Sequence, residues 1–222
     1  MAWHGRTSTL SKIDFERARR AIVQVGKHSR GFVCGGQIVT ALSCLPHLPK
    51  FHPFEYDETG QTVRYENIIG RLGEAPSRSA ICTFADIVSN IAILMELPET
   101  LEHEGTQYTG GTITGRDDHY RIRRPRGLGE GVETYHRIWL FTQDNQWSEY
   151  IAYMDRELIL YEAPFSARNA PVEVHSQLSG SPIIDEEGAA IGMLCVPHTN
   201  DEKFSIAAGP ILAWHLPGFL LG

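Results

Sequence analysis

The most informative stretch of this 222-residue chain for its fold is Gln177-Leu178-Ser179-Gly180-Ser181-Pro182. Ser179 precedes a glycine, so the backbone can come close to whatever the serine hydroxyl faces. After Pro182 the apolar pair Ile183-Ile184 leads into the acidic turn Asp185-Glu186-Glu187-Gly188, and a second apolar run covers residues 189–193. Two apolar runs around an acidic turn that contains glycine predict a β-hairpin directly after Ser179.

The composition is that of an ordinary globular protein, with 42% hydrophobic and 21% charged residues. A formal net charge of −7 argues against nucleic acid or an anionic membrane as the partner. No apolar run approaches the roughly 18 residues of a membrane span. The first residues lack the apolar segment of a secretion signal, so we expect a cytoplasmic protein. The four cysteines show no Cys-x-x-Cys spacing, which predicts buried thiols and no metal site.

Short apolar runs of strand length recur along the chain between glycine and proline turns. They cover residues 21–26, 61–66, 67–72, 79–84, 106–115, 137–142 and 157–161, while residues 147–154 are ambiguous. Residues 31–40 predict a hairpin turned at Gly35-Gly36, and residues 85–97 and 204–210 are added as strands by the resemblance given below. This pattern predicts an all-β protein. A Ser-x-x-Asp cap at Ser11 predicts a short N-terminal helix over residues 11–20. A C-terminal helix is expected to begin at Pro210 and to stop before Pro217.

Three stretches in chain order carry a resemblance to a known family. They are Thr40-Ala41-Leu42-Ser43-Cys44, residues 85–97 around Asn90, and Ser179-Gly180-Ser181-Pro182. They resemble the Thr-Ala-Ala-His-Cys end of the third strand, the Asp-Ile-Ala-Leu-Leu-x-Leu strand in its bacterial form, and the Gly-x-Ser-Gly-Gly-Pro nucleophile loop of trypsin-like (chymotrypsin-fold) serine peptidases. The resemblance covers residues 21–216.

The resemblance implies one domain over residues 1–222, made of two six-stranded antiparallel β-barrels. The first barrel would span about residues 21–100, the second about 105–209, and the C-terminal helix would start within 210–222. The site would lie in the cleft between the barrels, with Ser179 at the position of the nucleophile. An extended peptide would pair with the strand Met193-Leu194-Cys195, which are the implied substrate-binding residues.

The same alignment shows where this sequence departs from active members of the family. Ser43 occupies the position of the histidine base, and Asn90 occupies that of the aspartate. A hydroxyl cannot take a proton from another hydroxyl near neutral pH, and an asparagine has no charge to hold a histidinium. Gln177 replaces the glycine whose backbone N–H, with that of Ser179, would form the oxyanion hole. We therefore expect a catalytically degenerate peptidase without a cofactor, which binds or scaffolds a peptide or protein.

Several alternatives stay open from the sequence. The first is an active serine hydrolase in which Ser179 uses another base, with His47, His52, His175 and His198 as candidates. Asp86 aligns with an auxiliary acidic position, four residues before Asn90. A metal site built from the histidines is disfavoured because no pair has ligand spacing. The oligomeric state is left open.

An arginine-rich stretch and a pair of cysteines bear on the possible partner and on the redox environment of the chain. The arginine-rich stretch 116–126 contains Arg121, Arg123, Arg124 and Arg126, and is either a solvated loop or a docking patch for an acidic partner. Cys34 and Cys44 flank the turn that a disulfide spans in secreted relatives. Since no secretion signal is visible, we predict that both are free thiols.

Overall fold

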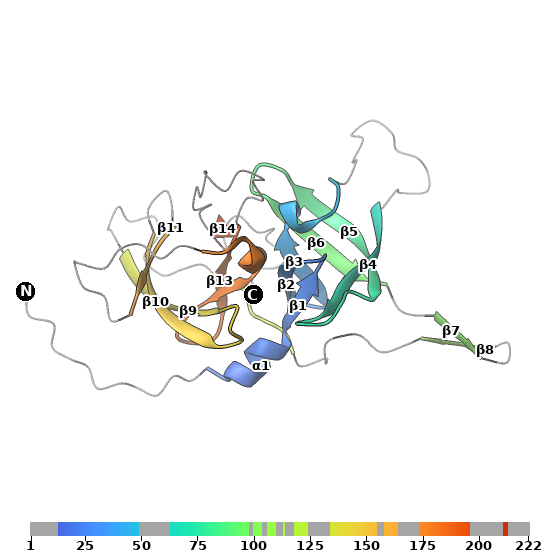
Figure 1. The fold of residues 1–222 in the computed structure, drawn as a ribbon, viewed down its shortest axis with the longest axis horizontal. Helices are drawn as coiled ribbons and strands as arrows, with labels where there is room; N and C mark the ends of the chain where they lie inside the picture. The colour runs from blue at the N-terminus through green and yellow to red at the C-terminus, as the bar shows by residue number, and fades with distance from the viewer. Residues whose placement is uncertain are drawn as a thin grey trace, which may run out of the picture.

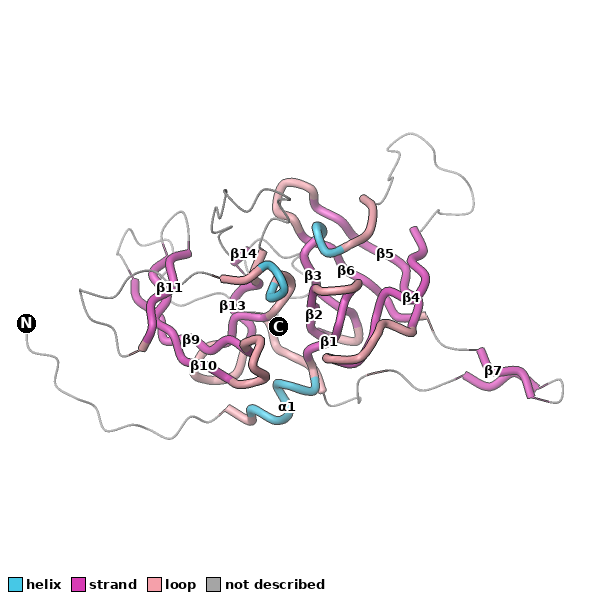
Figure 2. The backbone as a smooth tube through the Cα atoms, in the orientation of Figure 1, coloured by secondary structure: helices cyan, strands magenta, loops and turns pink. Residues whose placement is uncertain are grey.

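β-strands dominate the part of the chain that the computed structural model describes (Figures 1 and 2). The described residues are 13–48, 63–97, 100–103, 106–109, 113, 118–123, 134–154, 158–163, 174–195 and 211–212. Within them lie one α-helix, α1 (Phe15–Arg20), and two 3-10 helices, η1 (Leu42–Cys44) and η2 (Ser176–Leu178). None of these helices is long and apolar enough to cross a membrane.

The N-terminal half forms the closed six-stranded barrel that the sequence predicts. Its strands are β1 (Ile22–Val25), β2 (Ser29–Cys34), β3 (Gln37–Ala41), β4 (Val63–Arg71), β5 (Arg78–Asp86) and β6 (Ile91–Glu96). They pair antiparallel in the order β1-β2-β3-β6-β5-β4, and β4 closes on β1. Gly35 and Gly36 make the β2–β3 turn at φ of 56° and 79°, where glycine carries no steric cost. Phe32, Ile69 and Ile91 are fully buried inside the barrel.

A second set of six strands follows in the C-terminal half. It consists of β9 (Thr134–Phe141), β10 (Trp147–Met154), β11 (Leu158–Glu162), β12 (Pro182–Ile184), β13 (Ala190–Met193) and β14 (Ile211–Leu212). Their order is β11-β10-β9-β12-β13-β14. Among the described residues no ladder joins β11 to β14, so hydrogen bonds between these strands do not close the second barrel that we predicted. β12 and β13 form the hairpin expected after Ser179.

The two expected terminal helices have different outcomes. Helix α1 lies inside the predicted range, and Asp14 caps it by accepting the Arg17 N–H at 3.0 Å. The proposed cap residue Ser11 lies outside the described residues. At the other end the prediction is wrong for Ile211 and Leu212, which are a strand because their backbone pairs with β13. Residues 213–222 and the predicted strand 204–210 lie outside the described part.

Three strand predictions also change in the structure. Residues 106–115 were expected to open the second barrel, but β8 (Thr106–Thr109) pairs with β7 (Thr100–His103) in a separate two-stranded sheet. The ambiguous stretch 147–154 is strand β10. Residues 61–72 were expected as two strands, whereas β4 runs continuously from Val63 with a register shift around Asn67, whose φ is 48°. Alternating β-formers identify a strand, but they do not identify its partner.

The barrel and the second sheet are held against each other by several contacts. The Tyr120 N–H donates to Val33 O of β2 at 2.8 Å, while Ile122 forms a parallel bridge to Ala190 of β13. Trp147 of β10 donates its indole N–H to Phe15 O of helix α1 at 3.1 Å. One hydrophobic cluster contains residues of both units. Figure 1 shows α1 below the line where the two units meet.

Candidate functional site

Ser43 and Asn90, the predicted base and acid positions, lie in direct contact although 47 residues separate them. Ser43 is the middle residue of η1, directly after β3, and Asn90 immediately precedes β6. The Ser43 N–H donates to Asn90 Oδ1 at 2.9 Å, and Asn90 Nδ2 donates to Ser43 Oγ at 3.2 Å. The Leu42 N–H donates to Asn90 O at 3.0 Å. The pair is therefore bonded to itself and contains no group that titrates near neutral pH.

The turn before Asn90 explains the positions of both Asn90 and Asp86. Asn90 has a φ of 53°, in the left-handed region that asparagine tolerates better than most side chains. Asp86 Oδ1 accepts the N–H groups of Val88 at 2.9 Å and Ser89 at 3.2 Å. The carboxylate of Asp86 thus shapes the β5–β6 turn that presents Asn90.

Ser179 lies in a tight turn that packs on the barrel. It follows η2, its side chain is fully buried, and its carbonyl accepts the Arg30 N–H at 2.9 Å. Gly180 has a φ of 84°, and a Cβ at this position would lie 1.8 Å from Arg30 O. Only glycine fits there, which is the physical reason for the Ser-Gly pair that the sequence shows.

The two predicted oxyanion donors differ in their surroundings. The Ser179 N–H donates to Ser176 O at 3.0 Å, within the 3-10 turn. Gln177 is exposed, and its Oε1 accepts Gln143 Nε2 at 3.1 Å. An oxyanion hole needs N–H groups that point at the developing charge. In this conformation the Ser179 N–H is already used by the protein.

The strand Met193–Cys195, which we predicted to bind substrate, lies between Asn90 and the turn that contains Ser179. We call this turn, residues 176–181, the serine turn. Its three residues are buried, and Met193 pairs with Pro182 on one side and Ile211 on the other. The Leu194 N–H donates to Ser181 O at 2.9 Å, and Leu194 O accepts the Gly180 N–H at 2.7 Å. The Cys195 thiol then contacts Asn90 O at 3.8 Å. One chain of contacts therefore joins Ser179, Cys195 and the Ser43–Asn90 pair.

Of the four histidines considered as alternative bases, His47 and His175 lie in the described part of the chain, and the other two lie outside it. His47 is exposed near Ser43, and its ring packs on Tyr65 with 4.8 Å between centroids. His175 is exposed and immediately precedes η2, where its carbonyl accepts the Leu178 N–H at 2.9 Å. His52 and His198 lie outside the described residues, as do Arg124 and Arg126. Within the described part, no group of three His, Cys, Asp or Glu side chains is arranged to hold a metal ion.

All four cysteines are free and buried, as predicted for Cys34 and Cys44. Burial raises the pKa of the Cys34 thiol, which disfavours the reactive thiolate. Ser181, the second small residue of the serine turn, is fully buried, and its Oγ has no hydrogen-bond partner among the described residues. The pattern that this stretch resembles has a glycine at the position of Ser181. A glycine has no hydroxyl, so the unpartnered Oγ atom arises from this difference in sequence.

Arg30 is the residue that the sequence does not reveal. Its guanidinium is buried and donates to the carbonyls of Phe141 and, at 3.1 Å, Thr142. Its own carbonyl accepts the Thr40 hydroxyl at 2.7 Å. Burial lowers the pKa of Arg30 to about 10, so the group remains charged at neutral pH. Arg30 thus connects the barrel, the Ser179 turn and the end of β9, yet in the sequence it is one arginine in a polar turn.

Comparisons with known proteins find likenesses in fold among solved structures. No protein-family model matches the sequence, and no curated protein matches it. The fold is similar to the crystal structure of the Rv3671c protease in its inactive form, with a TM-score of 0.44 and 14% sequence identity. That alignment covers 89% of this chain and 85% of the other.

Proposed function

We propose that this chain is a serine-peptidase-like domain that does not cleave peptides and acts by binding a peptide or protein. The observation that carries the proposal is the mutual hydrogen bonding of Ser43 and Asn90 at the base and acid positions. Neither side chain titrates near neutral pH, so neither can take the proton of a serine nucleophile. The two residues are hydrogen-bonded to each other and present no base to Ser179.

The state of Ser179 supports the same proposal. Its side chain is fully buried, and its N–H is bonded to Ser176 O. Attack on a carbonyl needs an accessible hydroxyl, and stabilisation of the oxyanion needs an available N–H. Both would require the turn over residues 176–180 to change its conformation.

Binding can persist without catalysis because it depends on the framework of the cleft. Extended peptides bind by pairing with an exposed strand edge, which requires no catalytic group. Here the N–H and C=O of Leu194 are bonded to the turn that contains Ser179, so a ligand strand could pair with Leu194 only by displacing these bonds. The net charge of −7 favours a peptide or protein over a polyanion as the ligand.

The catalytic half of the proposal is tested with a fluorophosphonate probe at neutral pH. Labelling of the purified chain is expected to stay at the level of Ser179→Ala, while an active serine peptidase in the same assay labels fully. Stoichiometric labelling that disappears in Ser179→Ala would overturn the proposal. It would establish the alternative, an active hydrolase in which Ser179 uses another base.

The binding half is tested by selecting peptides from a display library and comparing two variants. Ser43→Phe places a ring at the partly buried Ser43–Asn90 pair, and Arg71→Ala changes an exposed residue at the far end of β4. Peptides selected by the wild-type chain should lose binding to Ser43→Phe and keep it with Arg71→Ala. Selected peptides that bind both variants equally would place the binding surface elsewhere.

A further inference from the structure

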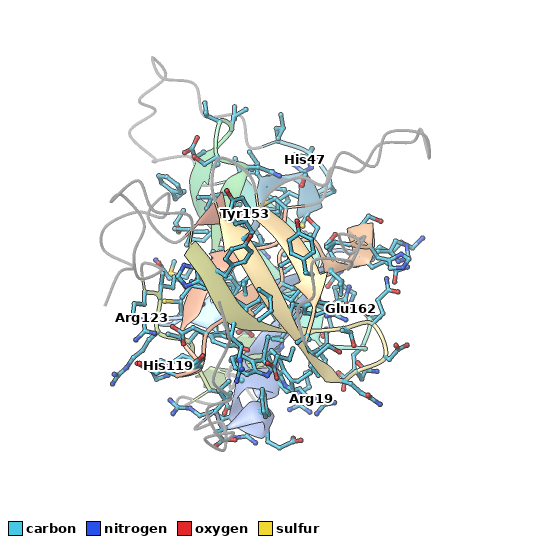
Figure 3. All side chains as sticks on the ribbon, turned by 90° about the vertical axis from the view of Figure 1, so that its left-hand side faces the viewer. Arg19, His47, His119, Arg123, Tyr153 and Glu162 are labelled. Atoms are coloured by element: carbon cyan, nitrogen blue, oxygen red, sulfur yellow. The ribbon has the colours of Figure 1, made fainter. Side chains whose placement is uncertain are left out.

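A concave site lies between α1, the hairpin turn after β12 and a segment that we call the strap, residues 118–123. This α1 pocket has a volume of about 620 Å³, within the usual range of ligand sites. Its walls are formed by Ile13, Asp14, Arg17, Ala18, residues 119–123 and residues 187–189. In Figure 3, His119 and Arg123 lie toward the lower end of the molecule, and His47, which follows η1, lies at the upper end.

The walls of the α1 pocket are fixed by hydrogen bonds. The Tyr120 hydroxyl donates to Ala18 O of α1, and the Tyr120 N–H donates to Val33 O at 2.8 Å. On its other side the strap is paired to β13, since Ala190 N donates to Arg121 O at 2.8 Å and Arg123 N donates to Ala190 O at 2.9 Å. A site fixed in this way loses little conformational entropy when it binds a ligand.

The floor and the rim of the pocket have different chemistry. Ile13, Ala18, Ile122 and Ala189 are buried apolar residues that can receive an apolar group. On the rim, the guanidinium of Arg123 is already paired with two carboxylates, Asp185 and Glu187.

The lining also contains two further arginines, Arg17 and Arg121, and one further carboxylate, Asp14. Asp14 Oδ1 is used by the Arg17 N–H at the start of α1. Arg121 is exposed, and its side chain has no ion-pair partner among the described residues. Arg121 therefore offers a guanidinium at the rim that no carboxylate in the described part of the chain pairs with.

We propose that the α1 pocket binds an acidic peptide segment of a protein partner, with one apolar side chain on the floor and a carboxylate at Arg121. A guanidinium binds a carboxylate through two parallel N–H groups, which fixes both orientation and charge. Nucleic acid fits poorly, because the lining offers few cations for a row of phosphates and its floor is apolar. The inference concerns a surface separate from the Ser43–Asn90 pair and does not rest on the proposed function.

The test uses two display libraries of blocked octapeptides. One library mixes Asp and Glu with apolar residues, and the matched library has Asn and Gln in place of the acids. The wild-type chain is expected to enrich peptides from the acidic library only. Fluorescence anisotropy then measures the best peptide against the wild-type chain, Arg121→Ala, His119→Trp and the control Arg19→Ala. Arg19 is an exposed arginine of the same helix α1 that does not line the pocket.

Arg121→Ala is expected to weaken binding at least about tenfold, the effect of losing one charge-assisted hydrogen bond. His119→Trp, which fills the rim, should abolish binding, whereas Arg19→Ala should stay within about twofold of the wild-type chain. Thermal unfolding confirms that each variant is folded. Equal enrichment from both libraries, or unchanged affinity in Arg121→Ala and His119→Trp, would overturn the proposal. A peptide in the α1 pocket also keeps its affinity in Ser43→Phe, which separates this result from binding at the cleft.

Discussion

Replacing Asn90 tests the contact on which the proposed function depends. Asn90→Gly removes both side-chain hydrogen bonds to Ser43, which lie at 2.9 and 3.2 Å. At about 0.5–1.5 kcal/mol each, the free energy of unfolding should fall by about 1–3 kcal/mol. Asn90→Ala removes the same bonds and also forces alanine to a φ of 53°, so it should cost about 1 kcal/mol more. Equilibrium unfolding in urea measures both changes.

The chain contains a matched control for this experiment. Asn145 lies in the exposed β9–β10 turn at a φ of 57°, and no side-chain hydrogen bond is formed by it among the described residues. Asn145→Gly therefore changes the same residue type in the same backbone conformation without removing a contact, and its effect should stay within about 0.5 kcal/mol. If Asn90→Gly and Asn145→Gly have equal effects, the Ser43–Asn90 hydrogen bonds contribute nothing to stability. That result would contradict a pair held together by its own hydrogen bonds.

Three further substitutions test the framework around the serine turn. Gly180→Ala puts a Cβ 1.8 Å from Arg30 O at a φ of 84°. The free energy of unfolding should therefore fall by more than about 3 kcal/mol. An unchanged thermal midpoint would contradict this geometry. Arg30→Met leaves the carbonyls of Phe141 and Thr142 without their donor. The free energy of unfolding, measured in urea, should fall by about 2–4 kcal/mol. A loss below about 0.5 kcal/mol would show that these hydrogen bonds are not formed in solution. Ser181→Ala removes a buried hydroxyl that has no partner in the described part of the chain, so stability should rise by up to about 1 kcal/mol; a clear loss would reveal a partner for Oγ.

Local patterns in the sequence predicted most strands of the first barrel, and the resemblance supplied their arrangement as a six-stranded barrel. Its strands are short apolar runs bounded by glycine turns, and the Gly35-Gly36 pair marks the β2–β3 hairpin directly. Each strand pairs mainly with neighbours in the chain, so local signals also constrain the topology. The second sheet was harder, because β9 pairs with β12 and β13 pairs with β14 across long connections. Ile211 and Leu212 have a helix-like sequence context, but backbone pairing with Gly192 and Met193 makes them a strand.

The candidate site was predictable where one residue type is physically required. Gly180 is such a position, because any side chain would collide with Arg30 O. Ser43 and Asn90 were placed by the resemblance, and the sequence could not show that they bond to each other. Arg30 gave no signal, since its role depends on carbonyls 111 and 112 residues away in the chain.

The site separates the parts that hold a serine turn in place from the parts that would perform catalysis. Gly180, the Arg30 guanidinium and the pairing of Leu194 with the turn all serve the geometry of the backbone. A buried arginine is costly unless it is fully hydrogen-bonded, so this framework persists only because each of its groups has a partner. At the two positions that the resemblance assigns to the base and the acid, a hydroxyl and a neutral amide are hydrogen-bonded to each other without any charge. A charged aspartate and an imidazole would instead need additional donors around them. The described site therefore combines a tightly constrained backbone with an uncharged pair, and the proposed binding function rests on this combination.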